Sequence, residues 1–306
     1  MTFTTKSLFE THQIRKTKAQ KEHFRSWLIP VLEQAGWRVC VEQGSGGSRN
    51  IVIGDITKAD VVITAHYDTC SVLPFPNFIT LKNPLFYWLY QIVIMVPMFG
   101  FLFGVSWLFS LVNPAFFVVG YWAAFLTMMG FLRYGPANKH TANDNTSGVS
   151  AVLDLALSLP EELREKAAFV LFDLEEKGLI GSASFAKKHK QEMKDKLLVN
   201  LDCVSDGETM LFVLRKGAKP HLERLKAAFV SDERITAEFM TKGYIYPSDQ
   251  NRFRCGVGVS ALLRSRWGIL YMDKIHTPKD TVYREENIEW LKEGCIRLIR
   301  GMEGHQ

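Results

Sequence analysis

The sequence predicts an α/β fold, a three-layer sandwich with a mostly parallel central sheet, plus an inserted two-helix transmembrane hairpin. Two observations predict the sandwich: apolar runs of strand length alternate with helical patterns, and polar residues follow directly after several of these runs. One observation predicts the hairpin, because residues 83–132 contain no Asp, Glu, Lys or Arg. We therefore expect the first part of the sandwich over residues 1–82, the hairpin over 83–132 and the second part over 133–306.

Strands and helices alternate along both parts of the sandwich. The predicted strands cover residues 60–65, 167–174, 197–201, 210–214 and 257–263. The predicted helices cover residues 6–35, 147–158, 181–194, 219–230 and 286–302. A Gly/Ser cluster at 44–48 predicts a surface turn between two further extended segments. Because ligands of such sheets gather at the carboxyl ends of parallel strands, we expect the functional residues there.

The charge-free block is long enough for two membrane spans. It divides at Asn113-Pro114 into residues 84–112 and 115–132, and about 18–20 apolar residues suffice to cross about 30 Å of hydrocarbon. Gly100 and Gly104 lie four residues apart in the first span, a spacing that allows close helix packing. The alternative is a buried hairpin of a soluble protein, but core helices seldom run so long without a polar face.

The charges that flank the block predict its orientation. Lys82, Arg133 and Lys139 lie next to the spans, whereas the turn near Asn113 carries no charge. Since a tight turn returns the chain to its starting side, the positive-inside bias places both parts of the sandwich on the cytoplasmic side of the cell membrane. The block then contacts the lipid bilayer, and a homodimer contact along it is compatible with that placement.

The composition argues against several other classes. The net charge of +5 is spread along the chain and gives little support to nucleic-acid binding. The five cysteines are odd in number and include no Cys-x-x-Cys pair, which argues against a disulfide framework and a structural zinc knot. The first 34 residues are polar and charged, so we expect no signal peptide.

Two short motifs supply candidate metal ligands in the first half of the chain. His66 and Asp68 end a predicted strand, where residues two apart project to the same side, so one can bind metal while the other orients it. A His-x-Asp triplet alone is a weak signal. Asp144 lies in a polar loop that leads into an apolar helix, and a capped helix start explains that loop equally well.

The later strands supply the remaining candidates. Glu175 and Glu176 follow an apolar strand, so that one carboxylate can bind metal while its neighbour moves protons, although adjacent glutamates are usually a solvated pair. Asp202 ends the next strand, and His276 lies in a segment that Pro278 keeps extended. Together the motifs supply the inventory of two zinc ions that share a carboxylate.

The order and wording of these motifs resemble family twenty-eight of the metallopeptidases, the di-zinc aminopeptidases that include bacterial leucyl aminopeptidase and aminopeptidase Y. The resemblance covers roughly residues 20–70 and 138–300. The matching segments are His66-Tyr67-Asp68, Asn143-Asp144-Asn145-Thr146-Ser147-Gly148-Val149, Glu175-Glu176-x-Gly178-x-x-Gly181-Ser182, Asn200-Leu201-Asp202 and His276-Thr277-Pro278-x-Asp280-Thr281. The chain departs from the family in carrying Ser248-Asp249-Gln250 where members often have Ser-Asp-His, and in the hairpin itself.

The resemblance implies a complete ligand set for two zinc ions. It assigns His66 and Asp202 to one ion, Glu176 and His276 to the other, and Asp144 to both.

The resemblance also implies the catalytic roles. Glu175 would be the general base and acid that activates a metal-bridging water, and Asp68 would orient His66. Substrate binding is assigned to the segment that holds Tyr244, Tyr246 and Asp249, where either tyrosine can assist the oxyanion.

The sequence thus predicts a membrane-anchored zinc-dependent aminopeptidase that removes N-terminal residues from peptides. The alternatives are a single-zinc acyltransferase like the glutaminyl cyclases, a non-catalytic peptide-binding membrane protein on the same fold, and a carboxypeptidase. Since the hairpin begins about fourteen residues after Asp68 and ends about twelve before Asp144, we expect the active-site mouth near the membrane surface. From that position we expect peptide substrates that are apolar, membrane-associated or delivered by a membrane partner.

Overall fold

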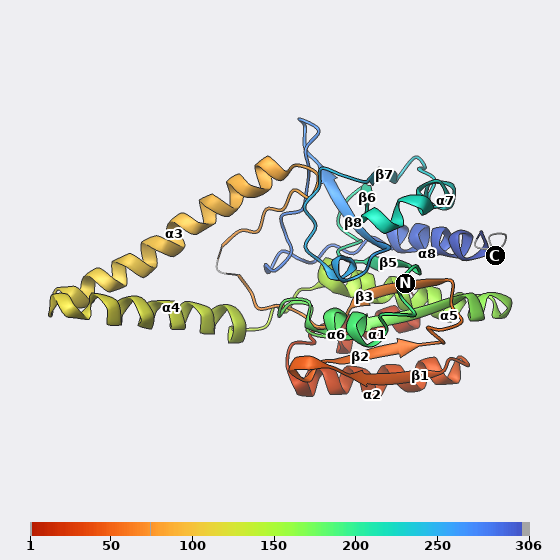
Figure 1. Ribbon diagram of the computed structural model, residues 1–306, viewed down its shortest axis with the longest axis horizontal. Coiled ribbons are helices and arrows are strands. Elements are labelled where there is room, and N and C mark those ends of the chain that lie inside the picture. Colours follow the sequence, from red (N-terminus) through yellow and green to blue (C-terminus); the bar gives the residue numbers. More distant parts are fainter. Residues whose placement is uncertain (1, 74, 302–306) are drawn as a thin grey trace.

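A computed structural model describes residues 2–73 and 75–301, within which nine strands form one sheet (Figure 1). The strands are β1 (Val39–Gln43), β2 (Arg49–Ile53), β3 (Val61–His66), β4 (Ala167–Phe172), β5 (Leu197–Leu201), β6 (Thr209–Leu214), β7 (Thr236–Met240), β8 (Gly256–Arg264) and β9 (Leu270–Tyr271). They follow the order β1-β2-β4-β3-β5-β8-β6-β7, and β9 pairs with β8. The four central strands β4, β3, β5 and β8 run parallel, which confirms the predicted α/β class.

Helices connect the strands and cover the sheet. Outside the hairpin they are α1 (Phe3–Thr11), α2 (Lys18–Gln34), α5 (Gly148–Ser158), α6 (Ile180–Lys188), α7 (Leu222–Ala228) and α8 (Glu285–Arg300). The predicted helix over 286–302 corresponds to α8, and its predicted end at residue 302 lies outside the described residues.

The prediction of one helix over residues 6–35 is wrong, because two helices occupy this stretch. Thr17 starts the second helix with a capping box, in which its side chain accepts the backbone N–H of Gln20. The side chain of Gln20 in turn accepts the backbone N–H of Thr17. In the segment between α1 and α2, Arg15 donates from its side chain to the carbonyl of Tyr67 and from its backbone to the hydroxyl of Thr69, directly after β3.

The alternation of side chains along β3 separates the two faces of the sheet. Val61, Ile63 and Ala65 join the largest cluster of buried apolar residues, which also includes residues of α2, α5, α7 and α8. Val62 joins a second cluster together with Phe185 of α6. His66 follows on the side of Val62, at the carboxyl end of the strand.

The charge-free block forms two helices, α3 (Pro84–Ser110) and α4 (Phe117–Tyr134), that project away from the sheet and meet at their far ends (Figure 1). Both are long and apolar enough to cross a membrane, by length and composition. Most of their large apolar side chains are exposed; Val96, for example, is 67% exposed. This surface makes a buried hairpin of a soluble protein a poor description of the described chain.

The two helices pack against each other at Gly120 rather than at the predicted glycine pair. A Cβ atom added to Gly120 would lie 3.0 Å from the Cα of Ser106, so only glycine fits there without a shift. Gly100 and Gly104 have open space where their Cβ atoms would lie. The predicted packing role of that pair is therefore wrong for the contact between α3 and α4.

The chain enters and leaves the hairpin through a narrow neck. Ser71 pairs with Ala137 in an antiparallel bridge, and the backbone N–H of Val72 donates to the carbonyl of Pro136 at 3.0 Å. Lys16 closes the neck, because its ammonium donates to Ser71 Oγ at 2.6 Å and to the carbonyl of Gly135. The hairpin is thus tied to the same segment that carries Asp68.

Candidate metal centre

The five predicted metal ligands converge at the carboxyl ends of the parallel strands. His66 ends β3, Glu176 follows β4 and Asp202 follows β5, and these strands are neighbours in the sheet. Asp144 comes from the loop before α5, and His276 from the loop after β9. This convergence follows from the parallel arrangement, because the carboxyl ends of parallel strands meet at one edge.

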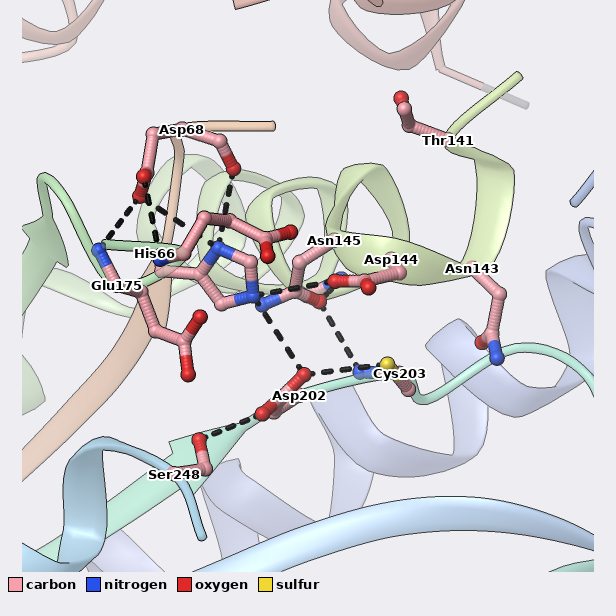
Figure 2. A network of polar contacts seen from close by, with 12 residues as sticks. His66, Asp68, Thr141, Asn143, Asp144, Asn145, Glu175, Asp202, Cys203 and Ser248 are labelled. Carbon is pink, nitrogen blue, oxygen red and sulfur yellow. Dashed lines mark hydrogen bonds and ion pairs between the residues drawn. The ribbon is translucent and has the colours of Figure 1, made fainter. Parts of the chain in front are cut away.

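The carboxylate of Asp144 lies between two imidazoles. Its Oδ1 atom is 3.3 Å from Nε2 of His66, and its Oδ2 atom is 2.8 Å from Nε2 of His276. Figure 2 shows that His66 contacts both Asp144 and Asp202. Asp202 Oδ1 lies 3.6 Å from His66 Nε2, and Glu176 Oε2 lies 3.4 Å from His276 Nε2. One carboxylate therefore joins two donor groups, each with its own histidine and its own second carboxylate.

Each donor group is compact enough to surround a single ion. The donor atoms of His66, Asp144 and Asp202 all lie within 4.8 Å of one another. The same limit holds for Asp144, Glu176 and His276, to which the sulfur of Cys70 is added. We call these the His66 half-site and the His276 half-site.

Asp280 and Asn143 hold the loop that carries Asp144. The Asp280 carboxylate accepts the backbone N–H of Asn143 at 2.7 Å and that of Asp144 at 3.0 Å. The side chain of Asn143 accepts the backbone N–H groups of Ser205 and Asp206. The loop is thus fixed from both sides, by the segment after His276 and by the segment after β5.

Asp68 mainly holds the Glu175-Glu176 segment. Its carboxylate accepts the backbone N–H of Glu175 at 3.0 Å and that of Glu176 at 3.3 Å. His66 Nδ1 lies 3.1 Å from the backbone carbonyl oxygen of Asp68, whereas the nearest carboxylate oxygen is 3.7 Å away. The backbone of Asp68 is therefore placed to orient His66, while its side chain positions the glutamate pair.

The buried carboxylates of the centre perturb one another. Burial raises the pKa of Glu175 well above its usual value, and it raises the pKa of Glu176 to about 8. Burial opposes protonation of His276, yet the carboxylates of Glu176 and Asp144 raise the pKa of this imidazole to about 10. Despite burial, the histidines hold the pKa of Asp144 below its usual range. The centre thus holds more carboxylates than imidazoles, and bound cations would favour the ionised form of these carboxylates.

The donor set fits zinc. Zinc in proteins takes imidazole nitrogen, carboxylate oxygen and thiolate sulfur, and the centre offers all three types. Glu176 Oε1 is buried and has no hydrogen-bond partner among the described residues, a costly arrangement that coordination of an ion would relieve.

Backbone strain accompanies the ligands. Leu174, Leu179, Cys203 and His276 are the non-glycine residues with positive φ in the described part of the chain, and His276 has φ of 61°. Leu174 precedes the glutamate pair and Cys203 follows Asp202. Such conformations cost free energy and concentrate at functional sites.

Two cavities adjoin the centre, and both include a hairpin helix in their walls. The smaller, about 200 Å³, is lined by donors of both half-sites, by the apolar side chains of Leu81, Met272 and Ile275, and by Tyr87 of α3. We call it the apolar cavity. No Lys or Arg of the described chain lines it.

The larger cavity, about 400 Å³, faces the other hairpin helix. Met129 and Leu132 of α4 line it together with Cys70, Glu176 and His276. Its remaining lining includes the basic residues Lys16, Arg133 and Lys177. The His276 half-site therefore lies in the wall that the two cavities share.

The three residues assigned to substrate binding occupy different positions. Tyr246 lines the apolar cavity, and its hydroxyl lies 3.0 Å from the backbone carbonyl oxygen of Asp202. Tyr244 donates to the carbonyl of Leu214 at 2.9 Å and lines neither cavity. Asp249 is fully buried, and burial raises its pKa to about 7, but it lines neither cavity. Of the three, Tyr246 is the one that the structure places at the centre.

Three residues at the centre were not among the candidates. Asp280 stands inside the last motif, and Ser248, whose hydroxyl donates to Asp202 Oδ2 at 2.5 Å, stands inside the Ser-Asp-Gln triplet. For both, the signal was a polar residue within a motif already singled out. Cys70 carried no such signal. It follows Asp68 by two residues but lies outside every motif, and it is one of five free cysteines in the chain.

Comparison with known proteins decides the family. A sequence profile described as peptidase family M28 matches residues 124–293, which is more than half of the chain. The chain belongs to peptidase family M28. The match includes Asp144, Glu175, Glu176, Asp202 and His276 and begins inside α4. A comparison with curated proteins finds no match.

Solved structures similar to this M28 chain include both aminopeptidases and glutaminyl cyclases. The LapA aminopeptidase of Legionella pneumophila has 15% identity and a TM-score of 0.59, with 99% of this chain and 68% of that chain covered. The glutaminyl cyclase of Porphyromonas gingivalis has 15% identity and a TM-score of 0.55, with 97% and 98% covered. A leucine aminopeptidase precursor of Bacteroides thetaiotaomicron has 14% identity and a TM-score of 0.53, with 98% and 97% covered. At such identities the likeness shows the fold.

Proposed function

We propose that this M28 peptidase is a membrane-anchored, zinc-dependent aminopeptidase. The observation that carries the proposal is the Asp144 carboxylate, which presents one oxygen to His66 and the other to His276. This arrangement suits two ions that share a carboxylate, with Asp202 completing one half-site and Glu176 the other. A peptidase site needs one further group that moves protons.

Glu175 is the proposed proton carrier. It lines the apolar cavity, its donor atom clusters with those of His66 and Glu176, and Asp68 fixes its backbone. Bound zinc would supply Lewis acidity that polarises the scissile carbonyl and acidifies the attacking water. Glu175 takes a proton from the water and returns it to the leaving amine. Tyr246 is proposed to support the pocket, whereas Tyr244 and Asp249 have weaker claims because they line neither cavity.

The charge of the apolar cavity favours an amino terminus over a carboxyl terminus as the recognised group. Its ionisable lining consists of carboxylates, imidazoles, phenols and a thiol, and the described part of the chain contributes no Lys or Arg to it. Even when bound ions offset the carboxylates, this lining offers acceptors for a free ammonium and no basic side chain that could pair with a terminal carboxylate. The apolar wall formed by Leu81, Met272 and Ile275 suits an apolar first side chain.

The hairpin is the proposed membrane anchor. Residues 83–132 divide the peptidase domain into parts 1–82 and 133–306, and both parts lie on the cytoplasmic side by the positive-inside bias. Tyr87 lies near the start of α3 and Met129 near the end of α4, and each lines one of the two cavities. The centre therefore opens close to the ends of the spans that join the sandwich. We therefore propose that apolar or membrane-associated peptides are the substrates.

A second candidate function is cyclisation by a single-zinc acyltransferase. The similar fold of the Porphyromonas gingivalis glutaminyl cyclase supports it. The presence of two donor groups around Asp144 favours two ions and hydrolysis instead. The zinc content per chain separates the two candidates.

Hydrolysis of matched peptides tests the proposal. The purified protein in detergent is incubated with peptides that begin with Leu, in free and N-acetylated form, with and without a chelator. We expect release of the first residue only from free amino termini, and loss of that release with the chelator. Cleavage of the acetylated peptides, or formation of pyroglutamate from N-terminal Gln without hydrolysis, would reject an aminopeptidase.

A further inference from the structure

Cys70 lies at the His276 half-site, although none of the motifs includes it. Its sulfur is within 4.8 Å of donor atoms of Asp144, Glu176 and His276. The residue is buried, with 5% of its surface exposed, and it lines the larger cavity. It follows Asp68 by two residues at the start of the hairpin neck, where its carbonyl accepts the backbone N–H of Asn138 at 3.2 Å.

The surroundings of Cys70 are unlike those of a cysteine that only fills space. Buried free cysteines usually behave as small apolar residues. Cys295 follows that rule, because it belongs to a cluster of buried apolar side chains. Cys203 also belongs to such a cluster, although its thiol donates to Asp202 Oδ1 at 3.2 Å. Cys70 belongs to none of the three clusters in the described chain and packs instead beside carboxylates and an imidazole.

The four donor atoms lie close enough together to surround one ion, since all of them are within 4.8 Å of one another. Imidazole, carboxylate and thiolate are the donor types that zinc takes in four-coordinate sites. A second observation points to a ligand at the same place. Glu176 Oε1 is buried without a hydrogen-bond partner in the described chain, and the Glu176 side chain is only 10% exposed.

We propose that Cys70 is the fourth protein ligand of the His276 half-site, bound as a thiolate. The proposal rests on the metal centre of the proposed function. On coordination the S–H bond breaks, the proton leaves to solvent, and the sulfur lone pair binds the ion. A thiolate favours softer divalent ions such as Zn²⁺ over Mg²⁺ or Mn²⁺.

A fourth ligand makes the two half-sites unequal. With Cys70, the His276 half-site has four protein donors, the number found in closed structural zinc sites. The His66 half-site has three, the number that leaves a position open for water or substrate. Glu175 clusters with His66 and with Glu176, so the proton carrier stands between the two half-sites. The His276 half-site then holds the shared carboxylate in place, and the open position for water or substrate lies on the His66 side.

Cobalt spectroscopy tests the proposal without relying on activity. Metal-free full-length protein in detergent is titrated with Co²⁺, and the near-ultraviolet thiolate-to-cobalt charge-transfer band is recorded. We expect the band in the wild type and in Cys203→Ser, the matched control beside the other half-site. In Cys70→Ser the band is lost while the visible bands of bound cobalt remain.

Two outcomes would overturn the assignment of Cys70 alone: a band that persists in Cys70→Ser, or a wild type that binds cobalt without showing the band. Failure of the wild type to bind any cobalt would overturn the metal centre as well, so the two failures are distinguishable. If Cys70→Ser does not fold, alkylation of the wild type followed by mass spectrometry decides. Bound Zn²⁺ should protect Cys70 but not the exposed Cys40, and equal labelling of Cys70 with and without zinc would overturn the proposal.

Discussion

The carboxylate of Asp280 holds the loop that carries Asp144 through two hydrogen bonds. The two carboxylate oxygens of Asp280 accept two successive backbone N–H groups, those of Asn143 and Asp144, at 2.7 and 3.0 Å. Asp280 itself lies four residues after His276, so a single segment both supplies a histidine and holds the carboxylate that this histidine faces. The position of Asp144 between the two half-sites therefore depends on a residue that binds no metal.

Replacing Asp280 with Asn should weaken metal binding. An amide offers one acceptor oxygen, and its NH₂ group would face one of the two backbone donors. Loss of such a supporting contact typically costs roughly 10–100-fold in metal affinity or activity. Competition titration with a chromophoric chelator measures the zinc affinity of Asp280→Asn. Asp273→Asn, a change at an exposed position of the same loop, is the control and should bind zinc like the wild type. Equal affinities for all three proteins would contradict the role of Asp280.

Replacing Glu175 with Gln should separate metal binding from catalysis. The amide keeps the shape of the side chain but cannot accept the proton of the attacking water. Turnover should fall by roughly 10²–10⁴-fold, the usual contribution of a positioned acid or base. Glu165→Gln removes a carboxylate from an exposed ion pair with Lys58 and should leave turnover unchanged. Zinc content is measured by elemental analysis, and a Glu175→Gln protein that retains both its zinc and its turnover would refute the assigned base.

The sequence predicted the parts of the fold that depend on local pattern. The predicted strand over 197–201 coincides with β5, because an unbroken apolar run has the length of a buried strand. The charge-free block forms two helices that meet near Asn113, as its length and the proline after Asn113 indicated. The predicted ligands converge because they follow neighbouring parallel strands.

Contacts between distant segments could not be predicted in the same way. Nothing local shows that the Asp68 carboxylate turns to the amides of Glu175 and Glu176, because that contact spans more than a hundred residues. The place of Cys70 has the same origin, since three other segments of the chain supply its neighbours. The short edge strand β7 was not predicted because none of its five residues is fully buried, so it lacks the apolar run that marks a buried strand.

Tyr87 should help to select the first residue of the substrate. Its side chain lines the apolar cavity from α3, so truncation to Ala removes apolar contact area there. Changes of this kind in apolar pockets alter discrimination by about 1–3 kcal/mol. We therefore expect kcat/KM to fall for peptides that begin with Leu or Phe and to change little for those that begin with Ala. Trp88→Ala is the control, because Trp88 is 59% exposed and lines neither cavity. The same loss in both variants would argue against a specific contact by Tyr87.

Removing the hairpin should release the protein from membranes. In the variant, a flexible Gly/Ser linker replaces residues 84–134, while the neck formed by Ser71, Ala137 and Lys16 is retained. The full-length protein should float with liposomes and resist alkaline extraction. Extraction would transfer its apolar helices from lipid into water, which is unfavourable. The linker variant should remain soluble and hydrolyse short soluble peptides, but lose its advantage on peptides bound to vesicles. Extraction of the full-length protein by alkali would contradict the anchor.

His12 should make the fold less stable as the pH falls. Its side chain is buried, stacks on Trp27 with ring centroids 4.5 Å apart, and lies near His23 and Arg15. Burial, together with these two neighbours, lowers the pKa of His12 to about 4, whereas an unfolded chain binds the proton near its usual pKa of about 6.5. Between these values the unfolded state binds more protons, so the free energy of unfolding decreases as the pH drops from about 6.5 towards 4. Denaturation midpoints of metal-free protein at pH 7.5 and 5 measure the effect. His12→Phe keeps an aromatic ring beside Trp27 but cannot take up a proton, so its midpoint should fall less than that of the wild type. A decrease of equal size in both proteins would show that other groups cause the acid sensitivity.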